Sequence, residues 1–166
     1  MSFICIYQED LIQDLKFMKI EDAVKVTKFK NEWHRATVNL VYTTNWINLT
    51  LEKRASRHQI TLQQFNVLRI LRGQYPNPAT NNLLKERMLT NTPDISRLID
   101  RLVTKGHVSR CKSDGDKRAV DLLITEEGLK ILEDLDSEML MADILPKNIT
   151  EKDCKLLSDL LDKFRG

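Results

Sequence analysis

The first part of the chain has the hydrophobic pattern of a long amphipathic helix. Apolar residues recur near helical spacing, at Trp33, Ala36, Leu40, Ile47 and Leu51. Neither glycine nor proline occurs before Gly73, so we expect one uninterrupted helix from about 28 to 57. Because this stripe is longer than a small core needs, it predicts that part of the helix packs against a partner.

The middle of the chain begins with two short helices. Thr61 followed by Gln64 is a capping-box pattern, which opens the first of them. Residues 73–78 (GQYPNP) are typical of a loop, and Thr80 can cap the second helix.

A third helix follows after a brief polar turn. Thr92 is a suitable N-cap, Pro93 a suitable first helical residue, and Gly106 stands where a glycine commonly ends a helix. Its apolar stripe follows the i, i+3, i+4, i+7 spacing and consists of Ile95, Leu98, Ile99 and Leu102.

The pattern then changes to that of a β-hairpin followed by further helices. Residues 108–112 and 119–124 are expected as strands around a charged turn, and Thr125 caps a helix that extends to about 142. Pro146 marks a break before a last helix that Thr150 opens. The expected fold is mainly α: a winged helix-turn-helix lobe at 58–125 with a β-hairpin wing, between helical dimerisation regions at 1–57 and 126–166.

Charge is distributed unevenly along the chain. The formal net charge is only +2. Residues 81–118 nevertheless carry nine basic and five acidic side chains, whereas residues 126–166 carry six basic and eleven acidic ones. A basic middle and an acidic end are consistent with a nucleic-acid reader that has a separate partner region.

Several classes of protein are disfavoured. No catalytic fingerprint is visible, so we expect no enzyme, no catalytic residues and no cofactor. The three cysteines (5, 111 and 154) have no spacing of a metal site or of a full disulfide framework, so no metal is expected. The chain lacks an 18-residue apolar stretch and a signal-peptide pattern, which predicts a cytoplasmic protein without membrane contact.

The outward face of the third helix carries the candidate chemistry. Arg97 and Arg101 lie four residues apart on one side, and Ser96 adds a short polar side chain. A helix that carries long basic side chains and small hydrogen-bond donors suits the DNA major groove. The alternative is that this face of the helix is only solvated. The candidate DNA-binding residues are Thr90, Asn91, Thr92, Asp94, Ser96, Arg97, Arg101, Lys112, Asp116, Lys117 and Arg118.

Ordered motifs resemble the MarR family of bacterial regulators. Residues 94–110 (DISRLIDRLVTKGHVSR) are similar to the family pattern S-R-x-I-D-R-L-x-x-K-G-x-V-x-R. Asp116 and Arg118 match its D-x-R, residues 122–128 its L-x-L/I-T-x-x-G, and residues 60–68 its L-T-x-x-Q-F-x-V-L, with Ile60 in place of Leu. The resemblance is continuous from about 58 to 128.

This resemblance implies a homodimer that binds double-stranded DNA. Terminal helices would interleave, the third helix would enter the major groove, and the wing would reach the minor groove or backbone through Arg118, oriented by Asp116. Two-fold symmetry then predicts a pseudo-palindromic operator with half-sites about 10 bp apart. The expected function is transcription regulation as a repressor by occlusion, with a protein-interaction module as the alternative from another class.

Two groups of residues are candidates for sensing a signal: aromatic side chains that could bind a small effector, and thiols that could be oxidised. Family members often bind small aromatic or phenolic effectors, and an aromatic cleft would suit one, from His34, Tyr42, Trp46 and Phe65. The alternative is that these are ordinary core or interface side chains. A thiol-based redox switch at Cys5 or Cys111 is a second possibility, while Cys154 falls on an apolar stripe and is expected to pack.

Overall fold

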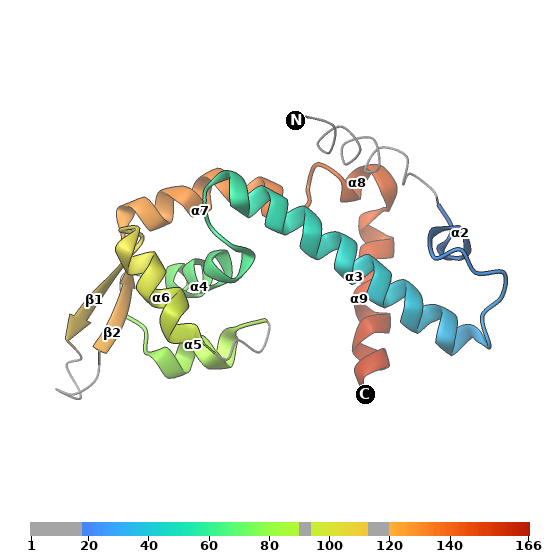
Figure 1. The fold of residues 1–166 in the computed structure, drawn as a ribbon, viewed down its shortest axis with the longest axis horizontal. Helices are drawn as coiled ribbons and strands as arrows, with labels where there is room; N and C mark the ends of the chain where they lie inside the picture. Colours follow the sequence, from blue (N-terminus) through green and yellow to red (C-terminus); the bar gives the residue numbers. More distant parts are fainter. Residues whose placement is uncertain (1–17, 90–93, 113–119) are drawn as a thin grey trace, which may run out of the picture. The chain divides into compact units, whose positions relative to one another are not determined.

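The computed structural model describes residues 18–89, 94–112 and 120–166. Helices dominate, and two strands form one antiparallel hairpin (Figure 1). In chain order the elements are α2 (Ile20–Ala23), α3 (Glu32–Arg57), α4 (Leu62–Arg72), α5 (Asn81–Arg87), α6 (Ile95–Thr104), β1 (Val108–Lys112), β2 (Val120–Ile124), α7 (Glu126–Met139), α8 (Leu145–Asn148) and α9 (Glu151–Arg165).

The chain divides into two compact units. One comprises Asn48–Asp143, called the lobe here, and the other comprises Met1–Ile47 with Ile144–Gly166. The lobe therefore includes the end of α3 and all of α7 in addition to the expected 58–125. This is physically reasonable because Ala55, Leu132 and Leu135 are fully buried in the lobe's core.

The lobe has a continuous hydrophobic core to which every one of its described elements contributes. α4 packs against α5, α6, α7 and β2, and α6 also packs against β1. The largest fully buried side chains are Leu68, Leu71, Leu84, Ile99, Leu102, Leu122, Leu132, Leu135 and Val67. Burial of this apolar surface, at about 25 cal/mol per Å², is the main source of the lobe's stability.

Local caps begin most helices where the sequence predicts. The Thr61 side chain accepts from the N–H of Gln64 (3.1 Å), and the Gln64 side chain accepts from the N–H of Thr61 (3.0 Å). Thr80 and Thr125 cap α5 and α7, and Thr150 caps α9 in the same way. Such caps satisfy N–H groups that the helix itself leaves unpaired.

Two helix boundaries outside α6 differ from expectation. α3 begins at Glu32, not near 28, because Asn31 Oδ1 accepts from the N–H of His34 (2.9 Å) and acts as an N-cap. α7 ends at Met139, three residues before the expected 142, and Met141 follows with a left-handed backbone (φ 57°). Pro146 therefore lies inside the short α8 and does not mark the end of α7.

The second unit leaves much apolar surface uncovered in the single chain. Glu21 of α2 and Arg35 of α3 are joined by an ion pair (Oε1–Nε 2.6 Å). α9 has no buried residue, and its Leu156, Leu157, Leu160 and Phe164 are each at least half exposed. Within the part of the chain that the structure describes, no helix has the length and hydrophobicity needed to cross a bilayer.

Candidate nucleic-acid interface

α6 presents one apolar and one polar face. Ile95, Leu98, Ile99 and Leu102 are all buried in the lobe's core, as their spacing predicts. The opposite face is exposed, with Ser96, Arg97, Asp100, Arg101 and Thr104. The core therefore fixes the rotation of this ten-residue rod and leaves its cations outward.

The start of α6 corrects one sequence expectation. The N-cap is Asp94, whose carboxylate accepts from the N–H of Arg97 (3.2 Å), so the helix begins at Ile95 and not at Pro93. Aspartate caps a helix as well as threonine does, and its charge favours the positive end of the helix dipole. Asp94 is half exposed, and its part in DNA binding stays a prediction.

The end of α6 is a Schellman motif. Gly106 has φ 78°, its N–H donates to Val103 O (2.9 Å), and the N–H of His107 donates to Leu102 O (3.0 Å). Glycine adopts this left-handed conformation without strain. Lys105, also at this end, donates to the carbonyl of Gln59, which ties α6 to the turn between α3 and α4.

The turn after α6 packs directly on the first turn of α7. Thr125 donates from its N–H to His107 O (3.1 Å) and from its hydroxyl to Gly106 O (2.7 Å), and it accepts from the N–H of Gly128. A Cβ on Gly128 would lie only 2.4 Å from His107 O. The K-G motif (residues 105–106) and the T-x-x-G motif (residues 125–128) thus supply the two halves of one contact. This contact fixes the hairpin beside α6.

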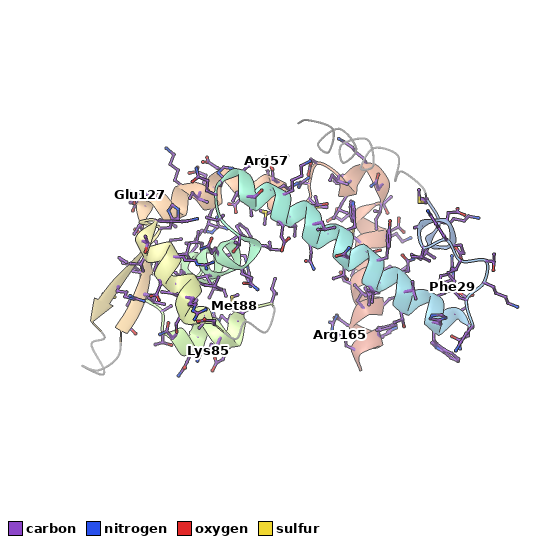
Figure 2. The ribbon with its side chains drawn as sticks, viewed as in Figure 1. Phe29, Arg57, Lys85, Met88, Glu127 and Arg165 are labelled. Carbon is purple, nitrogen blue, oxygen red and sulfur yellow. The ribbon has the colours of Figure 1, made fainter. Side chains whose placement is uncertain are left out.

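His107 is a half-buried group that sequence reasoning did not single out. Its Nδ1 is buried and has no hydrogen-bond partner within the described residues. Burial, followed by the nearby charge of Lys105, lowers the pKa of His107, while Glu127 opposes that change. Figure 2 shows Glu127 in the first turn of α7. The lobe therefore favours a neutral imidazole at this junction.

The cations of α6 have weak and replaceable partners. Arg97 Nε pairs with Asp94 Oδ2 (2.8 Å), but the Arg97 side chain stays 80% exposed. Arg101 is exposed and has no ion pair within residues 18–89, 94–112 and 120–166. Surface pairs contribute about 0–1 kcal/mol, so a phosphate could replace Asp94 at little cost.

Asp100 on the same face is already engaged. It pairs with Arg110 of β1, with both side chains about half exposed. This pair links α6 to the hairpin across the surface of the lobe. Arg110, one of the basic residues of the middle segment, is therefore paired with Asp100 of α6 while about half of its side chain stays exposed.

α5 lies before α6 and adds to the basic surface. Lys85 and Arg87 are exposed on α5, with Lys85 and Met88 labelled in Figure 2. The helix packs against α4 and α6, and Leu84 is its buried anchor. The arrangement of two short helices before a wing is that of a winged helix-turn-helix.

The wing is described up to its tip. β1 and β2 pair with Val108 opposite Ile124 and Lys112 opposite Val120, and Ala79 pairs with Leu122 on the other edge of β2. Lys112 thus lies at the end of β1, next to the tip. Six candidate DNA-binding residues lie outside the described residues: Thr90, Asn91, Thr92, Asp116, Lys117 and Arg118.

The candidate effector residues are spread over both units. Phe65 is buried in the lobe's core. His34, Tyr42 and Trp46 lie on α3 in the other unit, where the rings of His34 and Phe29 meet edge to face (centroids 5.4 Å apart). The effector cleft therefore stays a prediction from sequence.

The three cysteines also lie in different parts of the chain. Cys111 is a free, half-buried residue of β1 opposite Asp121, and Cys154 is free and half-buried on α9. Cys5 lies outside the described residues. Redox sensing by these thiols stays a prediction.

Comparison with known proteins assigns the family. The sequence model of the MarR family matches residues 60–120. The structure of the reduced form of MarR from E. coli is 30% identical, with a TM-score of 0.63, over 76% of this chain and 93% of that one. The chain belongs to the MarR family. The resemblance inferred from the motifs and the mainly α winged-helix fold are thereby confirmed.

Other relatives of this MarR-family chain show how much of its length is similar to known proteins. A mutant MarR from E. coli complexed with operator DNA is 27% identical, with a TM-score of 0.68, over 83% of this chain and 99% of that one. The HTH-type transcriptional regulator PecS from Dickeya dadantii is 25% identical over 87 residues. The chain spans about half the length of the curated relatives that it matches. In the case of PecS, the matched part is 52% of that protein.

Proposed function

We propose that this MarR-family chain is a homodimeric, sequence-specific DNA-binding regulator of transcription. The observation that carries the proposal is the exposed face of α6, where Ser96, Arg97 and Arg101 stand on a helix whose other face is clamped in the core. An α-helix fits the major groove, and arginine can bind guanine edges or phosphates. The similar E. coli protein complexed with operator DNA supports the same use of the fold.

The wing is the second proposed contact. Lys112 at the end of β1, with Lys117 and Arg118 beyond it, would contact phosphates or the minor groove, and Asp116 would orient Arg118. The turn residues Thr90, Asn91 and Thr92 would contact DNA before α6. These roles follow from the sequence motifs and from the position of the hairpin beside α6.

The homodimer is supported by uncovered apolar surface outside the lobe. Trp33 and Val41 of α3 are 80% and 64% exposed. Residues 36–47 contain no charged side chain over twelve positions, and α9 exposes a further apolar stripe. Monomeric proteins rarely leave apolar patches of this kind in contact with water. A second copy of the chain would cover them.

The proposed biological role is repression in the cytoplasm by occlusion of a promoter. A small aromatic or phenolic effector would modulate it through the side chains of His34, Tyr42, Trp46 and Phe65. The first three are supplied by α3 and the last by α4. Addition of small aromatic acids to a DNA-binding assay tests this part separately.

Selection of bound sequences from a random duplex pool tests the function. Full-length protein should enrich a pseudo-palindrome with half-sites about one helical turn apart, because each subunit presents one α6. If no duplex is retained even at about 50 mM salt, where backbone contacts are strongest, the DNA-binding proposal is wrong and a protein-interaction module is favoured.

A further inference from the structure

The chain passes between its two units at two places. The first lies inside α3, between Ile47 and Asn48, and the second lies after α7, between Asp143 and Ile144. At the first place the backbone is one continuous helix, α3. At the second it runs through residues 140–144, between the end of α7 and the start of α8.

Arg54 of α3 reaches the second of these connections. Its Nη2 forms an ion pair with Asp143 Oδ2 (2.7 Å), and its Nη1 donates to the carbonyl oxygen of Glu138 in the last turn of α7. That carbonyl also accepts from the N–H of Met141 (3.1 Å), so the Arg54 guanidinium is a further donor to it at the end of α7. One guanidinium therefore holds both the end of α7 and the last residue of the lobe.

The cost of a buried, unpaired charge keeps Asp143 beside Arg54. Arg54 is only 6% exposed, and a buried guanidinium is strongly unfavourable unless its partners are in place. Movement of Asp143 away from α3 would leave that charge buried without its carboxylate. The planar fork of arginine fixes both partners in one geometry, which lysine could not do.

Two neighbouring arginines provide a contrast within the same lobe. Arg57, labelled in Figure 2 at the end of α3, pairs with Glu138 Oε2 (3.1 Å) but is 58% exposed. Arg72 of α4 pairs with Asp136 of α7 (2.8 Å), well inside the sequence limits of the lobe. Of these three arginines, Arg54 alone is both buried and bound at the connection.

We propose that Arg54 is a positioning residue that sets the direction in which the chain leaves the lobe at Asp143. In the dimer it thereby sets the separation of the two α6 helices. This inference rests on the proposed function, since the separation matters only if two lobes bind one DNA molecule. Two binding sites on one scaffold gain affinity only when their spacing matches that of the target.

The test uses full-length protein and duplexes built from the selected half-site. Fluorescence anisotropy gives the affinity for a single half-site and for paired half-sites at spacings of about 8 to 13 bp, around one helical turn. The variants are Arg54→Met and Asp143→Ala, which each remove one partner. Arg72→Met is the matched control, because it removes the same charge and an α7 ion pair elsewhere in the lobe.

The wild type and Arg72→Met should bind tightly at one spacing. Arg54→Met and Asp143→Ala should lose about tenfold in affinity at that spacing and discriminate between spacings by less than about threefold, with single half-site affinity unchanged. Asp143→Ala leaves the buried Arg54 guanidinium without its carboxylate, whereas Arg54→Met leaves only a half-exposed carboxylate, so Arg54→Met provides a folded variant if Asp143→Ala is unstable.

Three other outcomes are distinguishable from this expected result. If the variants keep the wild-type spacing preference, the role of Arg54 is refuted while the proposed function stands. If the wild type itself retains no duplex, the proposed function fails and the inference fails with it. Equal losses on single and paired half-sites would indicate a merely structural role for Arg54 and would also refute the inference.

Discussion

Gly128 offers a sharp test of how α6, the hairpin and α7 are held together. A Cβ at this position would lie 2.4 Å from His107 O and 2.7 Å from Ile124 Cγ1. The carbonyl is fixed by its hydrogen bond from Thr125 (3.1 Å), and Ile124 is buried in the core. Alanine therefore cannot be accommodated by rotation of a flexible side chain, and the backbone must separate.

The magnitude follows from three opposing contributions. Overpacking of a tight contact costs about 1–3 kcal/mol, and a weakened backbone hydrogen bond costs about 1 kcal/mol. Alanine in place of glycine within a helix returns about 1 kcal/mol through its higher helix propensity. We expect Gly128→Ala to lower the free energy of unfolding by about 1–3 kcal/mol.

Urea unfolding followed by circular dichroism at fixed protein concentration measures this change. Gly73→Ala is the control, because Gly73 has an ordinary backbone (φ −66°) and its Cβ would lie 3.4 Å from the nearest atom, Ile70 O. The control should be neutral or up to about 1 kcal/mol more stable. If Gly128→Ala is as stable as Gly73→Ala, the proposed contact between the α6–β1 turn and α7 is refuted.

Three further predictions concern the same lobe. Since the pKa of His107 is lowered in the fold, the unfolded chain binds more protons below about pH 6.5, so the urea midpoint should fall as the pH drops through that value. His107→Gln should show a weaker fall, and an identical pH profile would contradict this reasoning. Thr61→Ala removes the capping-box acceptor of α4 and should cost about 1 kcal/mol in urea unfolding; an unchanged midpoint would contradict the cap. Lys117→Ala should reduce the slope of log affinity against log salt by about one if Lys117 contacts a phosphate, and an unchanged slope would exclude that contact.

Local interactions explain how much of the fold could be predicted from sequence. A cap such as Thr125 acts on an N–H three residues away, and a stripe such as that of α6 depends only on helical spacing. Strand β1 also follows the expected 108–112, because Gly106 ends α6 directly before it. These features need no knowledge of the distant chain.

Boundaries and long-range pairs lie beyond such patterns. Thr92 and Asp94 are both good caps two residues apart, so sequence alone could not choose between them. The end of α7 depends on a left-handed Met141, a conformation for which methionine gives no signal. Arg54 and Asp143 are 89 positions apart, and only the folding of the lobe, which includes the end of α3, brings them together. The same holds for Arg110 and Asp100, whose pairing depends on how β1 folds back on α6.

The most direct measurement of the central claim is the affinity of Arg101→Ala for the selected operator duplex. Arg101 is exposed on α6, so its loss should leave the helicity and the dimer mass unchanged. Operator affinity should fall by about tenfold or more, since a good arginine–base contact is worth about 1–3 kcal/mol. Lys130→Ala, which removes one exposed positive charge from α7, should bind as the wild type does. Equal operator affinity for Arg101→Ala and the wild type would contradict the claim that the outward face of α6 reads DNA.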